Sequence, residues 1–346
     1  MRDLSHLPFV KPLANRFREV VSGSKDGRPD WVAKIAEGDD EGFFGPESAV
    51  WKIHGSVVTI IGGIRALLLQ ATHPAPLNGV ASHSRYESDP LGRLAGTTKW
   101  LTITTFAART AIESEARRVN AMHSRVEGDF VTKDGSLAPY KASDERYLLW
   151  VHCAFTDSFL KSYLMAGKGV RPAATSQELV DDIECQLEGD ELADAYVAEW
   201  AKSAQPLGLN SAPRTLAELE SALDDFRKNE LALNDRTKEV VRFILKPPFS
   251  RSGIFFYSIL AKAAILTLDD RDRELLGLKK PAKINLYLSN LALKLLSAIL
   301  GHRSPSEKVA RERISRIRSR EVRSREVRSG SAGFDSGSST SIPMSH

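Results

Sequence analysis

Residues 73–100 read HPAPLNGVASHSRYESDPLGRLAGTTKW, and residues 113–128 read ESEARRVNAMHSRVEG. Together they carry three of the eight histidines of the chain, His73, His83 and His123. Arg93 and Thr97 are four residues apart, so on a helix their side chains share one face. This density of chemically active side chains indicates that a site, rather than a spacer, lies between residues 73 and 123.

The distance from Thr97 to His123 depends on whether the chain turns between them. On one unbroken helix, 26 residues at 1.5 Å each would separate the two by about 39 Å, too far to serve one site. The β-branched run at 102–105 weakens a helix, and Thr110 followed by Glu113 fits a capping box that starts another. We therefore predict a turn near residues 106–110 that brings Thr97 and His123 level on two antiparallel helices, with room for a cofactor between them.

The rest of the chain has the pattern of helices. Pro74 ends a long buried helix, and the next twenty residues are expected to be loop until SDPLGR starts a helix at Pro90, capped by Ser88 or Asp89. Asp134 and Gly135 mark a turn. No alternating strand pattern persists, so the predicted class is all-α. Helices are expected at about 47–71, 143–165, 176–203, 215–229, 235–246, 252–268 and 282–300.

Length and charge suggest three parts. The 346 residues, 42% of them hydrophobic, are enough for one large core. We predict an N-terminal extension (1–45), a helical domain (46–301) and a basic, disordered tail (302–346). Residues 302–328 hold ten Lys or Arg against four Glu, whereas the body is close to neutral. No aromatic residue interrupts this basic run, so no specific nucleic-acid partner is expected.

Location is inferred from the same features. The first thirty residues show no secretory signal, and the two cysteines, Cys153 and Cys185, suit a reducing compartment. A cytoplasmic protein is expected, with peripheral membrane contact through 282–328 left open, because the amphipathic last helix precedes the basic run. The oligomeric state is left open.

Four stretches resemble landmarks of the DUF2236 family, which includes the latex-clearing rubber oxygenases and the fungal oxygenase MpaB. They are GGIRALLLQATHP, GVASHSRYESDPLGRLAGT, RRVNAMHSRVEG and YLLWVHCAF, in that order. The resemblance is strongest over residues 45–170. It implies a globin-like helical core that holds haem b, dioxygen as co-substrate and a hydrophobic small-molecule substrate.

The resemblance also implies roles for particular residues. His123 is similar to the proximal iron ligand, and His152 falls at a family histidine. Arg93 and Thr97 resemble the arginine and threonine that latex-clearing proteins need for activity. Those proteins have a lysine directly before the threonine, where this chain has Gly96, with Lys99 two places beyond the threonine. The resemblance implies cleavage of a carbon–carbon double bond in a hydrophobic substrate. Because no export signal is visible, an isoprenoid or lipid-like molecule smaller than polyisoprene is expected.

Other interpretations remain open at this point. His73, His83 and Asp89, with or without His123, would supply the two histidines and one carboxylate of a non-haem iron site. A non-catalytic helical protein that binds haem or lipid is the third interpretation. Each histidine also has a structural alternative as a hydrogen-bonded core or loop residue, and Cys153 as a packed thiol rather than a thiolate ligand.

Overall fold

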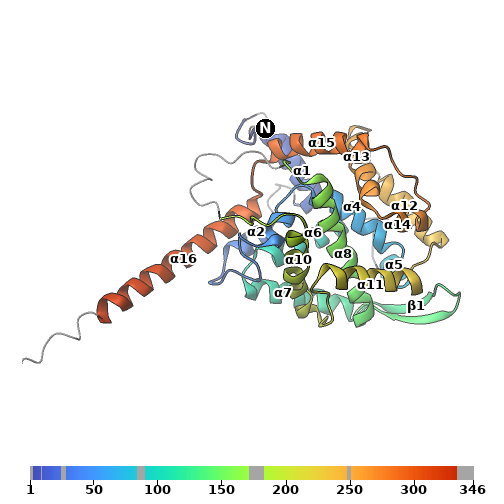
Figure 1. Ribbon diagram of the computed structural model, residues 1–346, viewed down its shortest axis with the longest axis horizontal. Coiled ribbons are helices and arrows are strands. Elements are labelled where there is room, and N and C mark those ends of the chain that lie inside the picture. The colour runs from blue at the N-terminus through green and yellow to red at the C-terminus, as the bar shows by residue number, and fades with distance from the viewer. Residues whose placement is uncertain are drawn as a thin grey trace, which may run out of the picture.

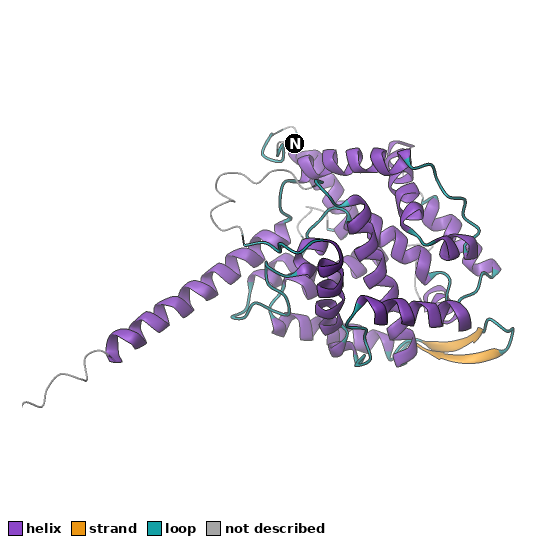
Figure 2. Ribbon diagram, viewed as in Figure 1, coloured by secondary structure: helices purple, strands orange, loops and turns teal. Residues whose placement is uncertain are grey.

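The computed structural model describes residues 3–8, 10–24, 29–83, 90–170, 183–247 and 251–332. They form helices around a common core, with one small hairpin at an edge (Figure 2), which confirms the all-α class. The expected likeness to globins stays a prediction. The helices are α1 (Lys11–Ser22), α2 (Trp31–Ala36), α3 (Ala49–His54), α4 (Thr59–Gln70), α5 (Pro74–His83), α6 (Pro90–Phe106), α7 (Arg109–His123), α8 (Glu145–Ala166), α10 (Gly189–Trp200), α11 (Leu216–Asn229), α12 (Asp235–Leu245), α13 (Arg251–Thr267), α14 (Asp270–Leu275), α15 (Ile284–Leu300) and α16 (Pro305–Ala332).

The centre of the fold is the pair α4 and α8, which lie side by side in Figure 1 and pack closely. Gly62 on α4 permits the close approach, because a Cβ there would lie 2.5 Å from the Cδ1 of Phe159 on α8. Beside this contact, the buried Arg65 and Asp157 form an ion pair at 2.6 Å. Ser158 and the carbonyl of Thr267 accept further hydrogen bonds from Arg65, so the buried charge is paired.

Two expected elements before α6 differ in the structure. The single helix predicted at 47–71 is interrupted after His54, so α3 and α4 are separate, although most of α4 is buried as expected. The loop predicted after Pro74 is wrong as far as His83, because α5 begins at Pro74. Proline disfavours a helical conformation at the residue before it, but it suits the first turn of a new helix. Here Pro74 starts a new helix directly after the end of α4.

A two-stranded antiparallel sheet was not predicted. β1 (Glu127–Val131) pairs with β2 (Leu137–Lys141), and the expected turn at Asp134 and Gly135 joins them. Gly135 adopts φ +89°, which explains why glycine stands there. The strands alternate too briefly for recognition by pattern, because only one residue in each, Phe130 and Tyr140, is buried.

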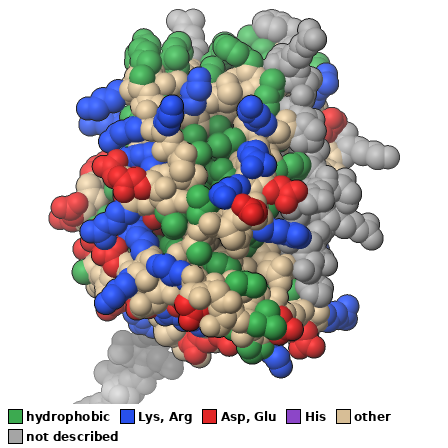
Figure 3. All heavy atoms as spheres, turned by 90° about the vertical axis from the view of Figure 1, so that its right-hand side faces the viewer, with side chains coloured by type: hydrophobic (Ala, Val, Ile, Leu, Met, Phe, Trp, Pro, Cys, Tyr) green, Lys and Arg blue, Asp and Glu red, His purple; other side chains and the backbone are tan. Residues whose placement is uncertain are grey.

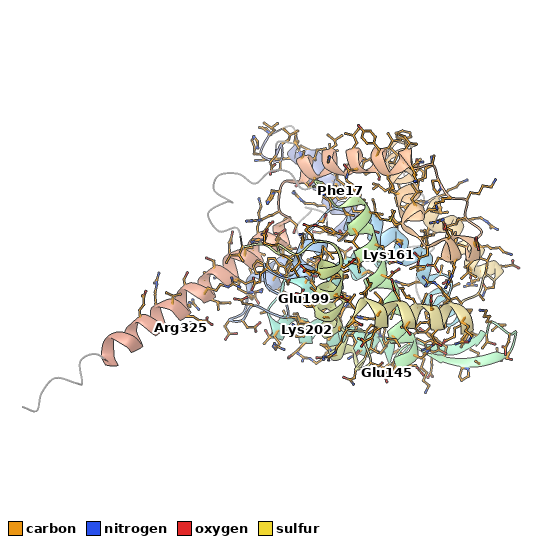
Figure 4. All side chains as sticks on the ribbon, viewed as in Figure 1. Phe17, Glu145, Lys161, Glu199, Lys202 and Arg325 are labelled. Atoms are coloured by element: carbon orange, nitrogen blue, oxygen red, sulfur yellow. The ribbon has the colours of Figure 1, made fainter. Side chains whose placement is uncertain are left out.

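The ends of the chain are part of the body. Trp31, Ile35 and Phe44 belong to the main core, and α2 packs on α16. Residues Pro305–Ala332, expected to be disordered, form the helix α16 instead. Ala310 and Ile314 are buried, and a few residues later α16 projects from the body (Figure 1), where Figure 4 shows Arg325. The body therefore extends beyond residue 302, while residues 333–346 lie outside the described ones.

The remaining boundaries agree with expectation in most cases. α8, α11 and α12 begin after the caps Asp144, Thr215 and Asn234, whose side chains each accept a backbone N–H bond. The helix expected from about 176 is shorter, since residues 183–188 are not helical and α10 starts at Gly189. In the described part of the chain, no single helix is long and apolar enough to cross a membrane; α15 and the start of α16 would suffice only together, across a 58° bend.

Candidate functional site

The candidate site is built on the elbow between α6 and α7. The predicted turn is confirmed, because α6 ends at Phe106 and α7 starts at Arg109. The capping box predicted at Thr110 and Glu113 is wrong: the cap position is Ala108, which is extended and has no capping side chain. The carboxylate of Asp40, 69 residues earlier, accepts the N–H of Arg109 instead, at 2.9 Å. A loop distant in sequence therefore starts α7.

The same loop fits closely against the elbow. Gly42 has φ +85°, and a Cβ at this position would lie 2.1 Å from the carbonyl oxygen of Ala107. The N–H of Gly42 also donates to Asp40, at 2.6 Å. The loop and the elbow are thus shaped to each other, and only glycine fits at this contact.

An ion pair ties the two helices together. Lys99 on α6 lies 3.2 Å from the buried carboxylate of Glu115 on α7, which Arg118 also contacts at 2.6 Å. Burial alone would raise the pKa of Glu115, but hydrogen bonds and charge from Arg118 and Lys99 bring it below its usual value. The ammonium group of Lys99 is therefore directed at α7.

His123 is the last residue of α7 and is mostly enclosed. Its Nδ1 is buried and has no hydrogen-bond partner among the described residues. Burial lowers the pKa of His123, so its ring is neutral at pH 7. A neutral imidazole with an unpartnered nitrogen has the form in which histidine binds a metal.

His152 on α8 has the same two properties. It is buried, and its Nε2 has no hydrogen-bond partner in the described part of the chain. Burial lowers the pKa of His152 to about 4. Two of the predicted cofactor-binding residues, His123 and His152, thus each carry a buried ring nitrogen that has no hydrogen-bond partner among the described residues.

The other predicted residues differ in how far the structure describes them. Thr97 lies on α6, partly buried, one turn after Arg93 on the same helix. The side chains of Arg93 and His83 and all of Asp89 lie outside the described residues, so their predicted roles stay predictions. That Thr97 and His123 come level also stays a prediction.

His73 is fully engaged in a buried network. Its Nδ1 accepts the N–H of Ala75 at 3.3 Å, so the proton is on Nε2, which donates to Glu230 at 3.0 Å. Arg146 donates to the other oxygen of Glu230, at 2.7 Å, and its guanidinium lies over the ring of Phe226. Sequence analysis missed Glu230 and Arg146, because 157 residues separate His73 from Glu230 and no local spacing relates them.

His54, unlike His73, was not among the residues selected from the sequence. The hydroxyl of Thr105 donates to the carbonyl of Leu101, so it accepts the Nδ1–H of His54 at 2.9 Å. Tyr196 donates its hydroxyl proton to Nε2, also at 2.9 Å. Burial lowers the pKa of His54 to about 3. Both nitrogens are satisfied, which indicates a structural role joining α3, α6 and α10.

The remaining candidates for metal binding are few. Cys153 is a free, buried cysteine, and burial raises the pKa of its thiol to about 12, so it is not a thiolate at pH 7. Across the described ranges, no three His, Cys, Asp or Glu side chains are arranged to hold a metal ion. The neutral rings of His123 and His152 are thus the described groups best suited to ligate iron that a cofactor brings.

These features describe an all-α protein with two neutral histidines that each carry a buried ring nitrogen without a hydrogen-bond partner among the described residues. The chain belongs to the family described as ER-bound oxygenase mpaB/B'/Rubber oxygenase, catalytic domain, whose model matches residues 51–295. This match confirms the family inferred from the four landmarks and assigns an oxygenase-type activity, with dioxygen and a small-molecule substrate. None of the curated proteins and none of the solved structures compared with the chain matches it.

Proposed function

We propose that the protein is a haem b-dependent oxygenase that cleaves a carbon–carbon double bond in a hydrophobic, isoprenoid or lipid-like substrate. The observation that carries the proposal is the buried, unpartnered Nδ1 of His123, within a segment that the oxygenase family model matches. An unsatisfied buried polar atom costs about 1–3 kcal/mol, so it calls for a group that engages the ring when the protein works. His123 fits such a group because burial keeps its ring neutral.

Three residues on α6 and α7 have a role in this proposal. His123 would hold the iron through one ring nitrogen, while the other donates a hydrogen bond that fixes the ring. The fork of Arg93 would pair with a propionate carboxylate. Thr97, one turn further along α6, would donate its hydroxyl to bound oxygen or to an ordered water. When bound, haem supplies the electrons and the open iron position that dioxygen activation requires.

The ion pair between Lys99 and Glu115 supports this arrangement. Lys99 lies eight residues before Ala107, and Glu115 seven residues after Ala108, so the pair joins positions nearly equidistant from the elbow. If the two helices continue antiparallel beyond this pair, Arg93 and His123 would lie on corresponding turns further out. Because Lys99 is held by Glu115, the ammonium group is not offered to the cofactor, and Gly96 adds no side chain at the position before Thr97.

The first test is the visible spectrum of protein expressed with added haem. We expect a Soret band in the wild type that His123→Gly abolishes and that added imidazole restores, because imidazole can occupy the vacated position. Met122→Ala, an exposed change beside the ligand, is the matched control and should keep the band. A full Soret band in His123→Gly with loss in His152→Gly would transfer the ligand role to His152. No band in folded wild type would refute haem binding.

A second test separates an oxygenase from a protein that only binds haem. Oxygen consumption and carbonyl products should appear together when the reduced protein is given long-chain alkenes or isoprenoids. Thr97→Val should lower the rate about tenfold or more and leave the Soret absorbance intact, since the hydroxyl acts on oxygen and not on haem binding. Haem uptake without turnover on any alkene would favour the non-catalytic alternative.

A further inference from the structure

α15 has one buried and one exposed apolar face. Ser289, Leu293, Leu296 and Ser297 are buried against the body. On the other side, five large hydrophobic residues are 40–67% exposed. Four of them are spaced by three or four residues and the fifth is adjacent to one of these, so all five lie on one side of the helix in a stripe about 100° wide. This α15 stripe consists of Ile284, Tyr287, Leu288, Leu291 and Leu295.

Neighbouring helices enlarge the apolar surface. The side-chain amide of Asn290 donates to the carbonyl of Ala166, 3.2 Å away, and so joins α15 to the end of α8, where Leu164 and Met165 are exposed. Phe255, on the adjoining helix α13, is 70% exposed. α15 and α13 form the upper edge of the molecule in Figure 1, and Figure 3 shows hydrophobic side chains gathered along that edge. Single exposed apolar residues are ordinary, but a line of them beside others indicates a contact surface.

The charged residues next to the stripe in the sequence are all basic, although one of them, Lys280, pairs with Asp270 at 3.3 Å. From Leu275 to Ser306 the sequence contains no Asp or Glu. Three exposed lysines, Lys279, Lys280 and Lys283, lead into α15, and Lys294 lies within it. Lys262, also exposed, adds to the charge on α13. An apolar stripe bordered by lysines is complementary to a surface with negative headgroups over an apolar interior.

The basic run at the end of the chain is arranged differently. Arg318 pairs with Glu41 and Glu47, and Arg311 with Glu184 and Glu307. Arg313 is buried. Arginines in the first half of α16 therefore pair with carboxylates of the body. Next to the apolar surface, exposed positive charge comes from the lysines before α15.

We propose that the α15 stripe docks on an anionic membrane surface. The helix lies in the plane of the interface, its apolar side chains enter the acyl boundary, and Lys279 and Lys283 contact the headgroups. The membrane contact suggested by the sequence at 282–328 thus becomes a contact of residues 279–295, without α16. The proposal does not depend on haem binding or on the reaction.

Vesicle sedimentation of the full chain tests the proposal. We expect binding to vesicles of phosphatidylcholine with phosphatidylserine, weaker binding to phosphatidylcholine alone, and a decrease with added salt. Leu291→Glu should reduce the partition coefficient at least fivefold, because it places a charge in the middle of the stripe. Lys279→Glu with Lys283→Glu should reduce binding about tenfold to the anionic vesicles only. The matched control is Leu137→Glu, at a residue 72% exposed on the hairpin, which should bind like wild type.

Three outcomes would overturn the proposal. The first is wild-type protein that binds no vesicles. The second is Leu291→Glu that binds as well as wild type while retaining its circular dichroism and melting temperature. The third is a wild-type dimer that Leu291→Glu converts to monomer without any vesicle binding, which would assign the stripe to a second copy of the chain. For support that does not rely on a disruptive change, Tyr287→Trp should show a blue-shifted emission with anionic vesicles.

Discussion

The guanidinium of Arg313 donates to the carbonyl oxygen of Phe106 at 2.9 Å and also to the carbonyl of Ile35. Phe106 is the last residue of α6, so a helix outside the family-matched segment fixes the elbow of the candidate site. Arg313→Met should lower the free energy of unfolding by about 2–4 kcal/mol, because buried carbonyls lose a charged donor. Arg323→Met, on the exposed part of α16, should change it by less than about 0.5 kcal/mol. Urea titration followed by circular dichroism measures both.

Truncation provides a coarser test of the same contact. A chain that stops after Arg318 keeps Ala310, Arg313 and Ile314, which are buried. It should melt within a few degrees of the full chain. A chain that stops after Ser304 should fail to fold. If both truncated chains melt alike, α16 is a dispensable arm after all.

Glu115 pairs with two cations, Lys99 and Arg118, and we expect their removal to cost different amounts of folding free energy. Lys99 joins α6 to Glu115, whereas Arg118 lies on the same helix as Glu115 and is more exposed. Lys99→Met should cost about 1–2 kcal/mol at pH 7 and Arg118→Met under about 0.5 kcal/mol. Since the pKa of Glu115 is lowered in the folded state, the stabilisation is full above the unfolded value of 4.5 and is lost as the pH falls through the folded value. Equal costs for the two changes at pH 7 would contradict this account.

The buried histidine of α3 predicts a dependence of stability on pH. The pKa of His54 is about 3 in the folded protein against 6.5 when unfolded. Above pH 6.5 both states are neutral and no effect is present; below it the unfolded state binds the proton more tightly, so stability falls. From pH 6.5 to 4.5 wild type should therefore lose about 2 kcal/mol more than His54→Gln. Thr105→Val, which removes a hydrogen-bond partner but no titrating group, should keep the wild-type slope.

Two adjacent glycines in α4 make a matched pair. Gly62→Ala would bring a Cβ to 2.5 Å from the ring of Phe159 and 3.2 Å from its Cα. To relieve this clash, α4 and α8 would have to move apart. We expect a loss of about 1–3 kcal/mol. A Cβ at Gly63 would meet nothing within 4 Å. Gly63→Ala should stabilise the protein by about 0.5–1 kcal/mol through helix propensity, and denaturant titration of the pair decides.

Local signals in the sequence were reliable where neighbouring residues complete the structure. The starts of α6, α8, α11 and α12 were predicted to within two residues, because the signals that start a helix act within one helical turn. Contacts between distant segments left no such signal. The N–H of Arg109 at the start of α7 donates to Asp40 on a distant loop, so the capping box predicted from neighbouring residues at Thr110 is wrong.

The C-terminal run and the candidate site show the same difference between local signals and contacts of distant segments. A run rich in arginine is typical of a solvated arm. In the folded protein, however, Arg313 donates to the carbonyl of Phe106 and Arg318 pairs with Glu41, and these contacts join the run to the body. His123 and His152 were selected through a family resemblance, and their neutral, enclosed rings are properties of the fold. The partners of His73 and His54 emerge only when α11 and α10 are in place.

The packing of the first helices on the last has a consequence for how the chain assembles. The N–H of Leu4 donates to the carbonyl of Ala298, Arg18 donates to that of Leu300, and Arg313 reaches Ile35 across 278 residues. Contacts between such distant residues form late, since the intervening chain must be ordered or closed as a long loop first. During synthesis α1 and α2 can pack on α6 once that helix has formed, but their contacts with α15 and α16 form only after residues beyond 295 have been made. The elbow reaches its final form only when almost the whole chain is present.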